Sequence, residues 1–304
     1  MKRFWVQWGE RYLYHPSLTQ KILSVLLLPF SWIYCLIAYL RYRRSVPKSF
    51  GIPVVSIGNL TVGGSGKTPV VIELAKHFAK PAIVLRGYGR KSRGMIVVKD
   101  KSTILCDVIK SGDEAMLYAQ SLANATVIVS EIRERGIAEA KAMGCEVVLL
   151  DDGYGKHTIE KLDLLIDVKT PNRFCLPSGA YRERLWKNKA VVMVIEGKSF
   201  TRSVKVQNPT PNMVLVTGIA RPERLDPYLP PVSAKVYFED HHFFNQGELE
   251  AIVERTGATS LLVTSKDFVK MSSFNLKLSI LELSIELDEV LIKSVKEYTD
   301  AKKD

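Results

Sequence analysis

The sequence predicts an α/β protein in which a parallel sheet carries helices on both faces. The first observation is a series of short apolar runs, rich in β-branched residues and too short for helices, at 53–59, 82–89, 125–131, 145–153, 189–195, 213–219 and 260–267. The second is a set of segments between them with apolar residues at helical spacing, at 67–79, 112–123 and 134–144. Strand and helix alternating in this way favour parallel pairing with helices on both faces.

We expect three parts along the chain. Residues 1–44 form an N-terminal membrane-associated helical segment, residues 45–195 form the core, and residues 196–304 form a smaller second α/β lobe with a C-terminal helix. The second boundary falls within Glu196–Asn212, because this stretch is polar, contains proline and has no strong period.

Composition fits a folded chain with an anion-attracting surface. Of the 304 residues 46% are hydrophobic and 25% charged, and the formal net charge is +11. Acidic lipids, phosphorylated substrates and nucleic acid all suit that charge. Nucleic acid is disfavoured, because the basic residues are dispersed and not interleaved with stacking aromatics. The four cysteines form no C-x-x-C pair, which fits a reducing compartment and argues against a disulfide framework or a zinc site.

The segment Ile22–Leu40 is the exception to this ordinary composition. It runs without a charge and would be about 28 Å long as a helix, against a hydrocarbon core of roughly 30 Å. Basic residues follow it at Arg41–Arg44, and interfacial aromatics precede it at Trp5, Trp8, Tyr12 and Tyr14. A signal peptide or a buried core helix is the alternative, and Pro29 can bend the segment into a dip. The pattern favours membrane attachment.

The stretch Gly58–Val71 contains nearly the whole pattern of a phosphate-binding loop. Such a loop reads G-x-x-x-x-G-K-[ST], and here Thr61 occupies the position of the first glycine. A strand precedes the loop, permissive glycines lie within it and a helix follows, so that Lys67 would reach the β/γ-phosphates and Thr68 would ligate Mg²⁺. A glycine-rich turn would explain the glycines but not the Lys-Thr pair. The pattern predicts a sheet of the P-loop NTPase type.

An acidic pair at the end of a later apolar run supports this interpretation. Asp151 and Asp152 follow residues 147–150, and ligands of open α/β sheets bind at the carboxyl ends of strands. Other polar clusters are ambiguous by themselves. The motif GDEA at 112–115 is also an ordinary helix start, and RGYGRKSRG at 86–94 is also an ordinary solvated loop.

Taken together and in order, several motifs closely resemble the tetraacyldisaccharide 4′-kinase family. They are VSIGNLTVGGSGKTP, LRGYGR, GDEAMLYA, LLDDGY, LPSGAYRE, GIARPERL, EDHHFF and VTSKDFVK, which cover essentially the whole chain. The resemblance implies a membrane-associated kinase that phosphorylates the 4′-hydroxyl of the lipid A disaccharide precursor with ATP and Mg²⁺. The family carries a threonine at the position of Thr61, so the irregular loop becomes part of the resemblance.

The resemblance also implies roles for individual residues. Asp113 matches the catalytic acidic residue, which accepts the proton of the sugar hydroxyl, and His241 matches its partner. The phosphates of ATP would be bound by Thr61, Gly63, Gly64, Ser65, Gly66, Lys67, Thr68 and Arg182, with Lys67 also catalytic. Magnesium would be held by Thr68, Asp151, Asp152 and Glu183. The lipid head group would contact Arg86, Tyr88, Arg90 and His242.

The sequence departs from the family's pattern at two places. The family commonly continues its acidic pair as D-D-G-[FY]-Q-H, whereas this chain has Gly155 and Lys156 at the last two positions. A glutamine near Mg²⁺ is therefore missing, unless water or His157 replaces it. The stretch between RERLW and GIARPERL is also shorter than usual.

We therefore expect γ-phosphoryl transfer from ATP to a tetraacyldisaccharide 1-phosphate at the cytoplasmic face of the bacterial inner membrane. Anionic lipid, rather than nucleic acid, is the expected surface partner, and a monomer is favoured although the sequence leaves the oligomeric state open. A membrane-tethered P-loop NTPase that acts as a switch or a transport ATPase is the alternative. Guanine specificity would require N-K-x-D, which the motif TSKD at 264–267 does not match.

Overall fold

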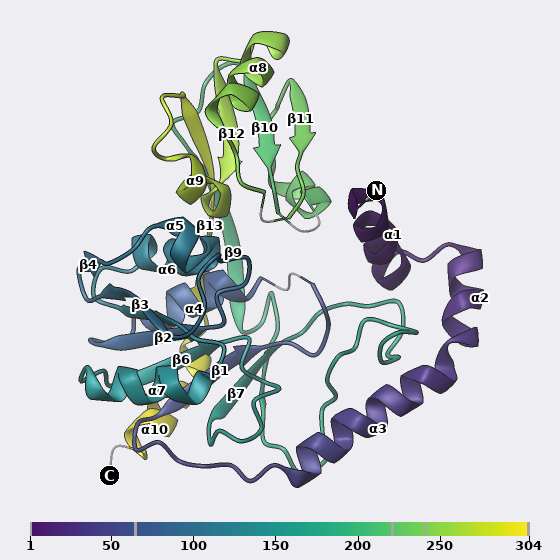
Figure 1. Cartoon of the computed structure of the whole chain (residues 1–304), viewed down its shortest axis with the longest axis vertical. Helices are drawn as coiled ribbons and strands as arrows, with labels where there is room; N and C mark the ends of the chain where they lie inside the picture. Colours follow the sequence, from purple (N-terminus) through teal and green to yellow (C-terminus); the bar gives the residue numbers. More distant parts are fainter. Residues whose placement is uncertain (1, 64–65, 220–221, 241, 303–304) are drawn as a thin grey trace.

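The computed structural model describes residues 2–63, 66–219, 222–240 and 242–302, and two sheets organise them (Figure 1). The larger sheet has eight strands in the order β4-β3-β5-β2-β6-β1-β7-β8. Their bounds in chain order are β1 Val54–Gly58, β2 Pro81–Leu85, β3 Ile96–Asp100, β4 Thr103–Ile104, β5 Thr126–Val129, β6 Val147–Asp151, β7 Leu162–Ile166 and β8 Val192–Val194. Six strands pair in parallel, and β3 and β4 form an antiparallel edge.

Helices cover both faces of this sheet, as the sequence predicts. The core on one face includes residues of α4 (Lys67–Ala75), α6 (Asp113–Ser121) and α10 (Glu289–Asp300), and the core on the other includes residues of α7 (Arg133–Ala142). The short helix α5 (Val108–Ser111) precedes α6. Because side chains alternate along a strand, Val55 lies in one core and Val54 in the other. This alternation fixes which side of β1 faces the α4 helix.

The smaller sheet has the order β11-β10-β12-β13-β9 and lies above the first in Figure 1. Its elements are β9 Phe200–Gln207, β10 Met213–Thr217, the 3₁₀ helix η1 Pro222–Tyr228, β11 Ala234–Tyr237, α8 Gln246–Thr256, β12 Ser260–Thr264, α9 Ser265–Met271 and β13 Leu278–Leu287. The stretch Glu196–Asn212, expected to be irregular, contains β9, whose residues alternate between more and less exposed positions. The division at 44 and 195 stays a prediction.

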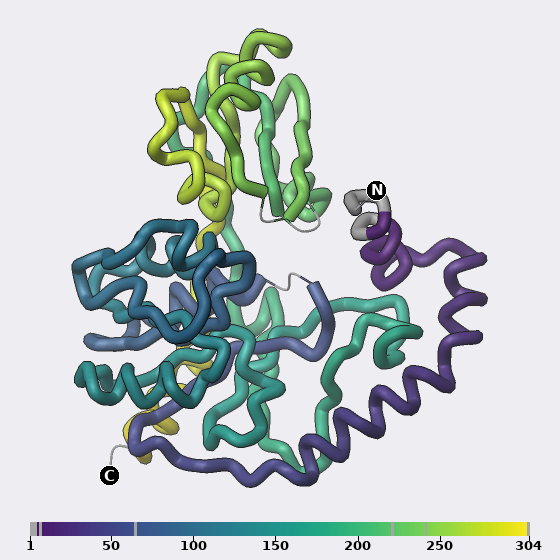
Figure 2. The backbone as a smooth tube through the Cα atoms, in the orientation of Figure 1, coloured from purple at the N-terminus to yellow at the C-terminus, as the bar shows by residue number. Residues whose placement is uncertain are grey.

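The C-terminal helix α10 packs on the first sheet rather than beside the second. Leu291 and Val295 of α10 belong to the same core as α4 and α6. The long strand β13 explains this, because Ile285 and Leu287 at its far end also join that core. Figure 2 follows the chain from the N-terminal helices through the lower sheet, into the upper sheet and back to the lower one.

Three helices, α1 (Lys2–Tyr14), α2 (Leu18–Leu26) and α3 (Leu28–Arg44), form the N-terminal segment. Ser17 caps α2 in a capping box with Gln20, and Pro29 lies in the first turn of α3. The axes of α2 and α3 meet at 58°. In the described part of the chain no single helix is long and apolar enough to cross a bilayer, and only this bent pair reaches the required length and composition together.

A disulfide joins α3 to the loop that follows β7. Cys35 and Cys175 are bonded, with Cα atoms 6.1 Å apart across 140 residues of sequence. Ser31, one helical turn earlier, donates a hydrogen bond of 2.9 Å to the carbonyl oxygen of Cys175. The expectation of a chain without disulfides is therefore wrong, because cysteine spacing in the sequence does not report which helices and loops pack together.

Candidate active site

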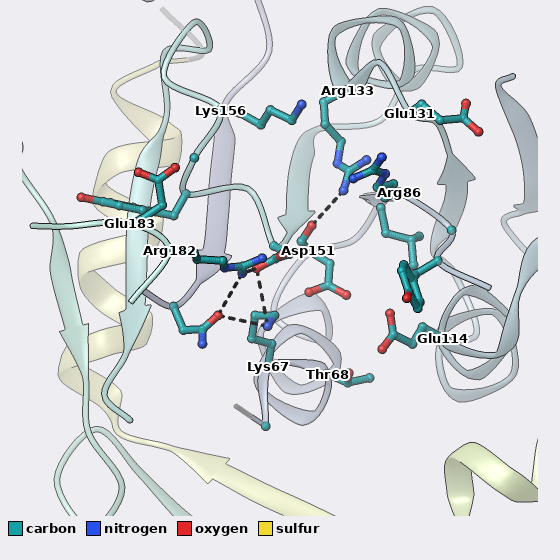
Figure 3. Close-up of a pocket in the computed structure, with 18 of the residues that line it drawn as sticks. Lys67, Thr68, Arg86, Glu114, Glu131, Arg133, Asp151, Lys156, Arg182 and Glu183 are labelled. Atoms are coloured by element: carbon teal, nitrogen blue, oxygen red, sulfur yellow. Dashed lines mark hydrogen bonds and ion pairs between the residues drawn. The ribbon is translucent and has the colours of Figure 1, made fainter. Parts of the chain in front are cut away.

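A cavity of about 650 Å³ opens at the carboxyl ends of β1, β2 and β6, in front of the N-terminus of α4 (Figure 3). Parallel strands deliver their following loops to one edge of the sheet, which is where ligands of open α/β sheets bind. The lining is strongly charged. Its cations are Arg41, Lys67, Arg86, Arg133, Lys156 and Arg182, and its acids are Glu114, Glu131, Asp151, Asp152 and Glu183.

The loop between β1 and α4 has the backbone that a phosphate loop needs. Gly63 and Gly66 have φ values of 82° and 76°, which glycine adopts without strain. Gly66 is the N-cap of α4, so Lys67 is the first residue of the helix. Lys67 and Thr68 both line the cavity, next to the positive end of the helix dipole. Gly64 and Ser65 lie outside the described residues.

Asn59 connects Thr61 to Lys67. The side-chain amide of Asn59 donates to the hydroxyl of Thr61 at 3.0 Å and to its carbonyl oxygen at 2.9 Å. The amide oxygen of Asn59 therefore faces the other way and accepts from Lys67 Nζ at 3.2 Å and from Arg182 Nη2 at 3.2 Å. Thr61 itself is buried. Its hydroxyl thus helps to orient the amide that contacts the two cations.

Asp152 is paired with those same cations. Lys67 Nζ lies 3.5 Å from Oδ1 of Asp152, and Arg182 forms an ion pair with the same oxygen. Burial opposes ionisation of Asp152, but the charges of Lys67 and Arg182 outweigh it and hold its pKa below the usual range. Asp152 has a φ of 56°, an uncommon conformation that turns the chain sharply after β6.

Asp151 has the opposite electrostatic character. Burial, followed by the nearby charge of Glu114, raises the pKa of Asp151 to about 6. Tyr118 on α6 donates a hydrogen bond of 3.0 Å to Oδ2 of Asp151, while Oδ1 is buried and has no hydrogen-bond partner in the described part of the chain. A buried carboxylate oxygen without a partner is costly, so a cation at this position would stabilise it.

The oxygen atoms near this carboxylate fit magnesium bound together with a nucleotide. Thr68 and Asp151 both line the cavity, and each is hydrogen-bonded to Tyr118. Among the described residues no group of three or more His, Cys, Asp or Glu side chains is arranged as a metal cage. Magnesium is usually held by one or two carboxylates, with waters and substrate phosphates completing the shell. Thr68, Asp151 and Asp152 therefore suit that ion.

Glu183 is held by a different set of partners. Arg41 at the end of α3 forms an ion pair with Oε1 of Glu183, and His157 Nε2 lies 3.4 Å from Oε2. Burial lowers the pKa of His157, with Lys189 adding to the effect. Glu183 lines the cavity, but its contacts in the structure are with cations of the α3 side rather than with Asp151. His157, named as a possible substitute for the missing glutamine, contacts Glu183.

Asp113 lies where the two lobes meet. It begins α6, is buried, and its Oδ2 lies 3.6 Å from both Lys266 and Lys270 of α9. Among the described residues Glu114 lines the cavity and Asp113 does not. His241, the predicted partner of Asp113, is outside the described residues. Two ammonium groups at this distance offset the negative charge of the Asp113 carboxylate.

The four predicted head-group residues are not all brought together. Arg86 and Tyr88 line the cavity, and Tyr88 is 66% exposed. The Arg90 side chain is directed into an ion pair with Glu131 and a hydrogen bond to the carbonyl oxygen of Gly94.

His242 lies in the second lobe, within an aromatic cluster of that lobe. Its ring stacks on Phe238 at 4.6 Å and lies 3.0 Å from Glu248. In the described structure His242 does not line the cavity.

Sequence reasoning missed several residues that line the cavity, among them Asn59, Arg133 and Glu114. Asn59 directly follows strand β1, Arg133 begins α7 just after strand β5, and Glu114 is the second residue of α6. A polar residue soon after a buried parallel strand is a usable signal for Asn59 and Arg133. Glu114 gives no such signal, because acids in the first turn of a helix are ordinary.

The fold and this arrangement of loop, lysine and acidic pair define a P-loop nucleotide-binding protein. A family model described as tetraacyldisaccharide-1-P 4′-kinase matches residues 23–213 and 199–299. The chain belongs to that family. Membership confirms the resemblance seen in the sequence, the α/β fold class and the expected class of enzyme, a kinase.

Individual relatives agree with this assignment. The chain is 45% identical over 293 residues to the tetraacyldisaccharide 4′-kinase of Helicobacter pylori strain 26695, covering 95% of this chain and 94% of the relative. It is 43% identical to the tetraacyldisaccharide 4′-kinase of Aliarcobacter butzleri, covering 93% of each chain. It is 42% identical to that of Campylobacter jejuni strain NCTC 11168, covering 96% of this chain and 95% of the relative. The crystal structure of LpxK from Aquifex aeolicus in complex with ATP has a TM-score of 0.72 and 25% identity, covering 91% of this chain and 99% of that one.

Proposed function

We propose that this protein transfers the γ-phosphoryl group of ATP to the 4′-hydroxyl of a tetraacyldisaccharide 1-phosphate. The observation that carries the proposal is the group formed by Asn59, Lys67, Asp152 and Arg182 at the phosphate loop, in a chain of the tetraacyldisaccharide 4′-kinase family. The relatives with this name support the acceptor, and the neighbour crystallised with ATP supports the donor.

The roles of the residues follow from charge and position. Lys67 and Arg182 would bind the β- and γ-phosphates, together with backbone groups of the loop at Gly63, Gly64, Ser65 and Gly66. Magnesium, bound at Thr68, Asp151 and Asp152, would neutralise charge that develops on the phosphate oxygens. The Glu183 carboxylate lies farther along the same wall, paired with Arg41.

The acceptor hydroxyl needs a base. The 4′-oxygen forms a bond to the γ-phosphorus, the bond from phosphorus to the β,γ-bridging oxygen breaks, ADP leaves, and the hydroxyl proton passes to Asp113. Lys266 and Lys270 lie 3.6 Å from Oδ2 of Asp113 and offset the negative charge of its carboxylate. His241 would orient the hydroxyl. Arg86, Tyr88, Arg90 and His242 are proposed to contact the phosphorylated head group, of which Arg86 and Tyr88 line the cavity.

We also propose that α2 and α3 hold the enzyme at the cytoplasmic face of the bacterial inner membrane, against anionic lipid. The buried residues of α2 and α3 are small or polar (Gln20, Ser24, Ser31 and Ala38), and Ser24 and Ser31 donate to the loop after β7, whereas many of the larger apolar residues are exposed. More than half of each of these side chains is exposed: Leu18, Ile22, Val25, Leu26, Phe30, Trp32, Ile33, Leu36 and Ile37. Such a continuous exposed apolar surface with basic residues at its end suits a lipid interface.

Flotation with vesicles tests this attachment. The full chain is mixed with vesicles that contain phosphatidylglycerol, and an Ile33→Ser, Ile37→Ser double variant is expected to lose most of its binding. Val290→Ser is a control, because Val290 is also more than half exposed but lies on α10. Equal binding by the double variant and the wild type would exclude this surface. We expect no nucleic-acid binding and a monomer in detergent.

A kinase assay tests the activity itself. The purified full chain is incubated in detergent micelles with labelled ATP, Mg²⁺ and tetraacyldisaccharide 1-phosphate, and label is followed in lipid and in free phosphate. Lys67→Ala should abolish transfer, whereas Asp113→Asn should lower kcat by at least about 100-fold with little change in ATP affinity. Rapid loss of ATP without labelled lipid would favour a switch or transport ATPase instead.

A further inference from the structure

Lys156 is the cavity residue that the proposed mechanism leaves without a role. It lines the cavity on the loop that follows Asp151 and Asp152, at a position where the family's pattern has histidine. Figure 3 shows its side chain extending along the cavity wall toward Arg133. Within the described residues its ammonium group forms no hydrogen bond and no ion pair.

The surroundings of Lys156 are positive. Burial, followed by the charge of Arg133 and then that of Arg86 and Arg41, lowers the pKa of Lys156, with Glu134 acting in the opposite direction. Arg133 is itself 3% exposed, donates to the carbonyl oxygens of Ser130 and Asp151, and has an Nε atom without a hydrogen-bond partner among the described residues. Burial and the charge of Arg86 lower the pKa of Arg133, against the attraction of Asp151, Asp152 and Glu134. Figure 3 places the guanidinium groups of Arg86 and Arg133 next to each other.

Burial outweighs the attraction of the nearby carboxylates for Arg133, so the positive cluster would gain from a further counter-charge. Like charges that are partly buried repel one another more strongly than they would in water, and each desolvated cation loses hydration. A bound anion removes both costs, and a phosphate has enough acceptor oxygens for two guanidinium groups and an ammonium group. The cluster is therefore complementary to a phosphate group.

Gly155 explains how the lysine reaches this wall. A Cβ atom at position 155 would lie 2.8 Å from Oε1 of Glu183, closer than any side chain allows. A side chain at position 155 would require the Glu183 carboxylate to move. The Gly-Lys pair therefore acts as one unit, in which the glycine permits the path and Lys156 reaches the cavity.

We propose that Lys156, together with Arg86 and Arg133, binds a phosphate group on the wall of the cavity opposite Lys67. The inference rests on the proposed function, because both phosphorylated substrates of that reaction enter this cavity. The phosphate belongs either to ATP or to C1 of the lipid disaccharide. Lys156 is the distinguishing residue, since its position carries another residue type in the family's pattern.

Equilibrium binding tests the proposal without depending on turnover. Wild type, Lys156→Met and Lys156→Arg are titrated in detergent micelles with a non-hydrolysable ATP analogue plus Mg²⁺, with tetraacyldisaccharide 1-phosphate, and with the same lipid lacking its 1-phosphate. Lys156→Met should weaken the binding of one phosphorylated ligand by about tenfold or more. Lys156→Arg should keep the affinity within about threefold of the wild-type value. Lys169→Met is the control, because Lys169 is exposed and outside the cavity.

The pattern of losses identifies the phosphate. Weaker binding of the ATP analogue with unchanged lipid binding assigns Lys156 to ATP. Weaker binding of the lipid 1-phosphate, with no loss for the lipid that lacks it, assigns Lys156 to the 1-phosphate. Unchanged affinities for both ligands in a folded Lys156→Met variant overturn the inference. A wild type that binds these ligands but transfers no phosphate would refute the proposed function and leave the binding result to decide on Lys156.

Discussion

The ammonium group of Lys266, on α9 beside the second sheet, lies 3.6 Å from Oδ2 of Asp113 on α6 of the first lobe. The same ammonium lies 3.5 Å from Asp240 and 3.6 Å from Glu114. Lys270, one turn further along α9, lies 3.6 Å from Asp113 and 3.4 Å from Asp267. Burial opposes the charge of Lys266, but these carboxylates outweigh it and raise its pKa. Ion pairs thus join α6 to α9.

Removing one of these lysines should destabilise the protein strongly. Lys270→Met keeps the length of the side chain but leaves Asp113 and Asp267 with less compensating charge, and both carboxylates are buried. Breaking a buried ion pair costs about 3–5 kcal/mol. The free energy of unfolding in urea measures the effect. Lys293→Met is the control, because its pair with Glu297 is exposed and should be worth less than about 1 kcal/mol. Equal effects of the two variants would contradict a buried cluster.

The hydroxyl of Thr61 should matter for nucleotide binding through Asn59. Thr61→Val keeps the shape but removes the hydroxyl that accepts from the Asn59 amide, so the amide oxygen is less firmly directed at Lys67 and Arg182. One neutral hydrogen bond contributes roughly 1 kcal/mol, which is about fivefold in affinity. Calorimetric titration with Mg-ATP measures it. Thr61→Ser retains the hydroxyl and should bind as the wild type does; a loss in both variants would point to packing.

Replacing Asp151 or Asp152 by asparagine should change the stability of the protein in opposite directions. Asp151 has its pKa raised from 3.8 to about 6, so its carboxylate destabilises the fold increasingly as pH rises from about 4 to 6, and fully above that. Asp151→Asn should therefore raise the stability of the metal-free protein at pH 8 by up to about 3 kcal/mol, and by about half as much at pH 5. Urea unfolding with a chelator present measures both.

Asp152→Asn is the matched control for that experiment. The pKa of Asp152 is lowered, so its carboxylate stabilises the fold above the unfolded pKa, and this contribution is lost as pH falls through the lower folded value. Asparagine also tolerates the positive φ of this position. Asp152→Asn should lower stability at pH 8, so a shift of the same sign in both variants would refute the opposed environments.

Gly155→Ala should be destabilising although alanine is small. The added methyl would lie 2.8 Å from Glu183 Oε1, which forces Glu183 or the loop to move, and overpacking typically costs about 1–3 kcal/mol. Thermal unfolding measures the loss. Gly247→Ala on α8 is the control, because its nearest neighbouring atom would lie 3.7 Å away and alanine favours the helix. A neutral Gly155→Ala would show that the loop has room.

Much of the fold was predictable because local patterns determine it. The β1 strand, the glycines and Lys67 at the start of α4 lie within fourteen residues of sequence, so their geometry follows from local rules. The strand β9 was not predicted, because the polar composition of Phe200–Gln207 made the segment resemble a linker; its alternation appears in the structure as a burial pattern.

Other features depend on contacts that no local pattern encodes. The amphipathic pattern of α10 predicts that its apolar face is buried. It does not predict that this face packs in the core of the larger sheet rather than in the core of the smaller one. Arg182 and Asn59 are 123 residues apart, and their hydrogen bond requires the loop after β7 to return to β1. The Cys35–Cys175 disulfide likewise joins residues that are far apart in the sequence.

The ladder between β9 and β13 has a mechanical consequence. The chain enters the second sheet through β9 and leaves it through β13, and the two strands pair antiparallel over eight consecutive positions from Phe200–Leu287 to Gln207–Ile280. Both covalent connections between the halves therefore run side by side as one stiff ribbon. We expect that any rotation of the upper half about this ribbon would change the separation of Lys266 from Asp113, which is 3.6 Å in this structure.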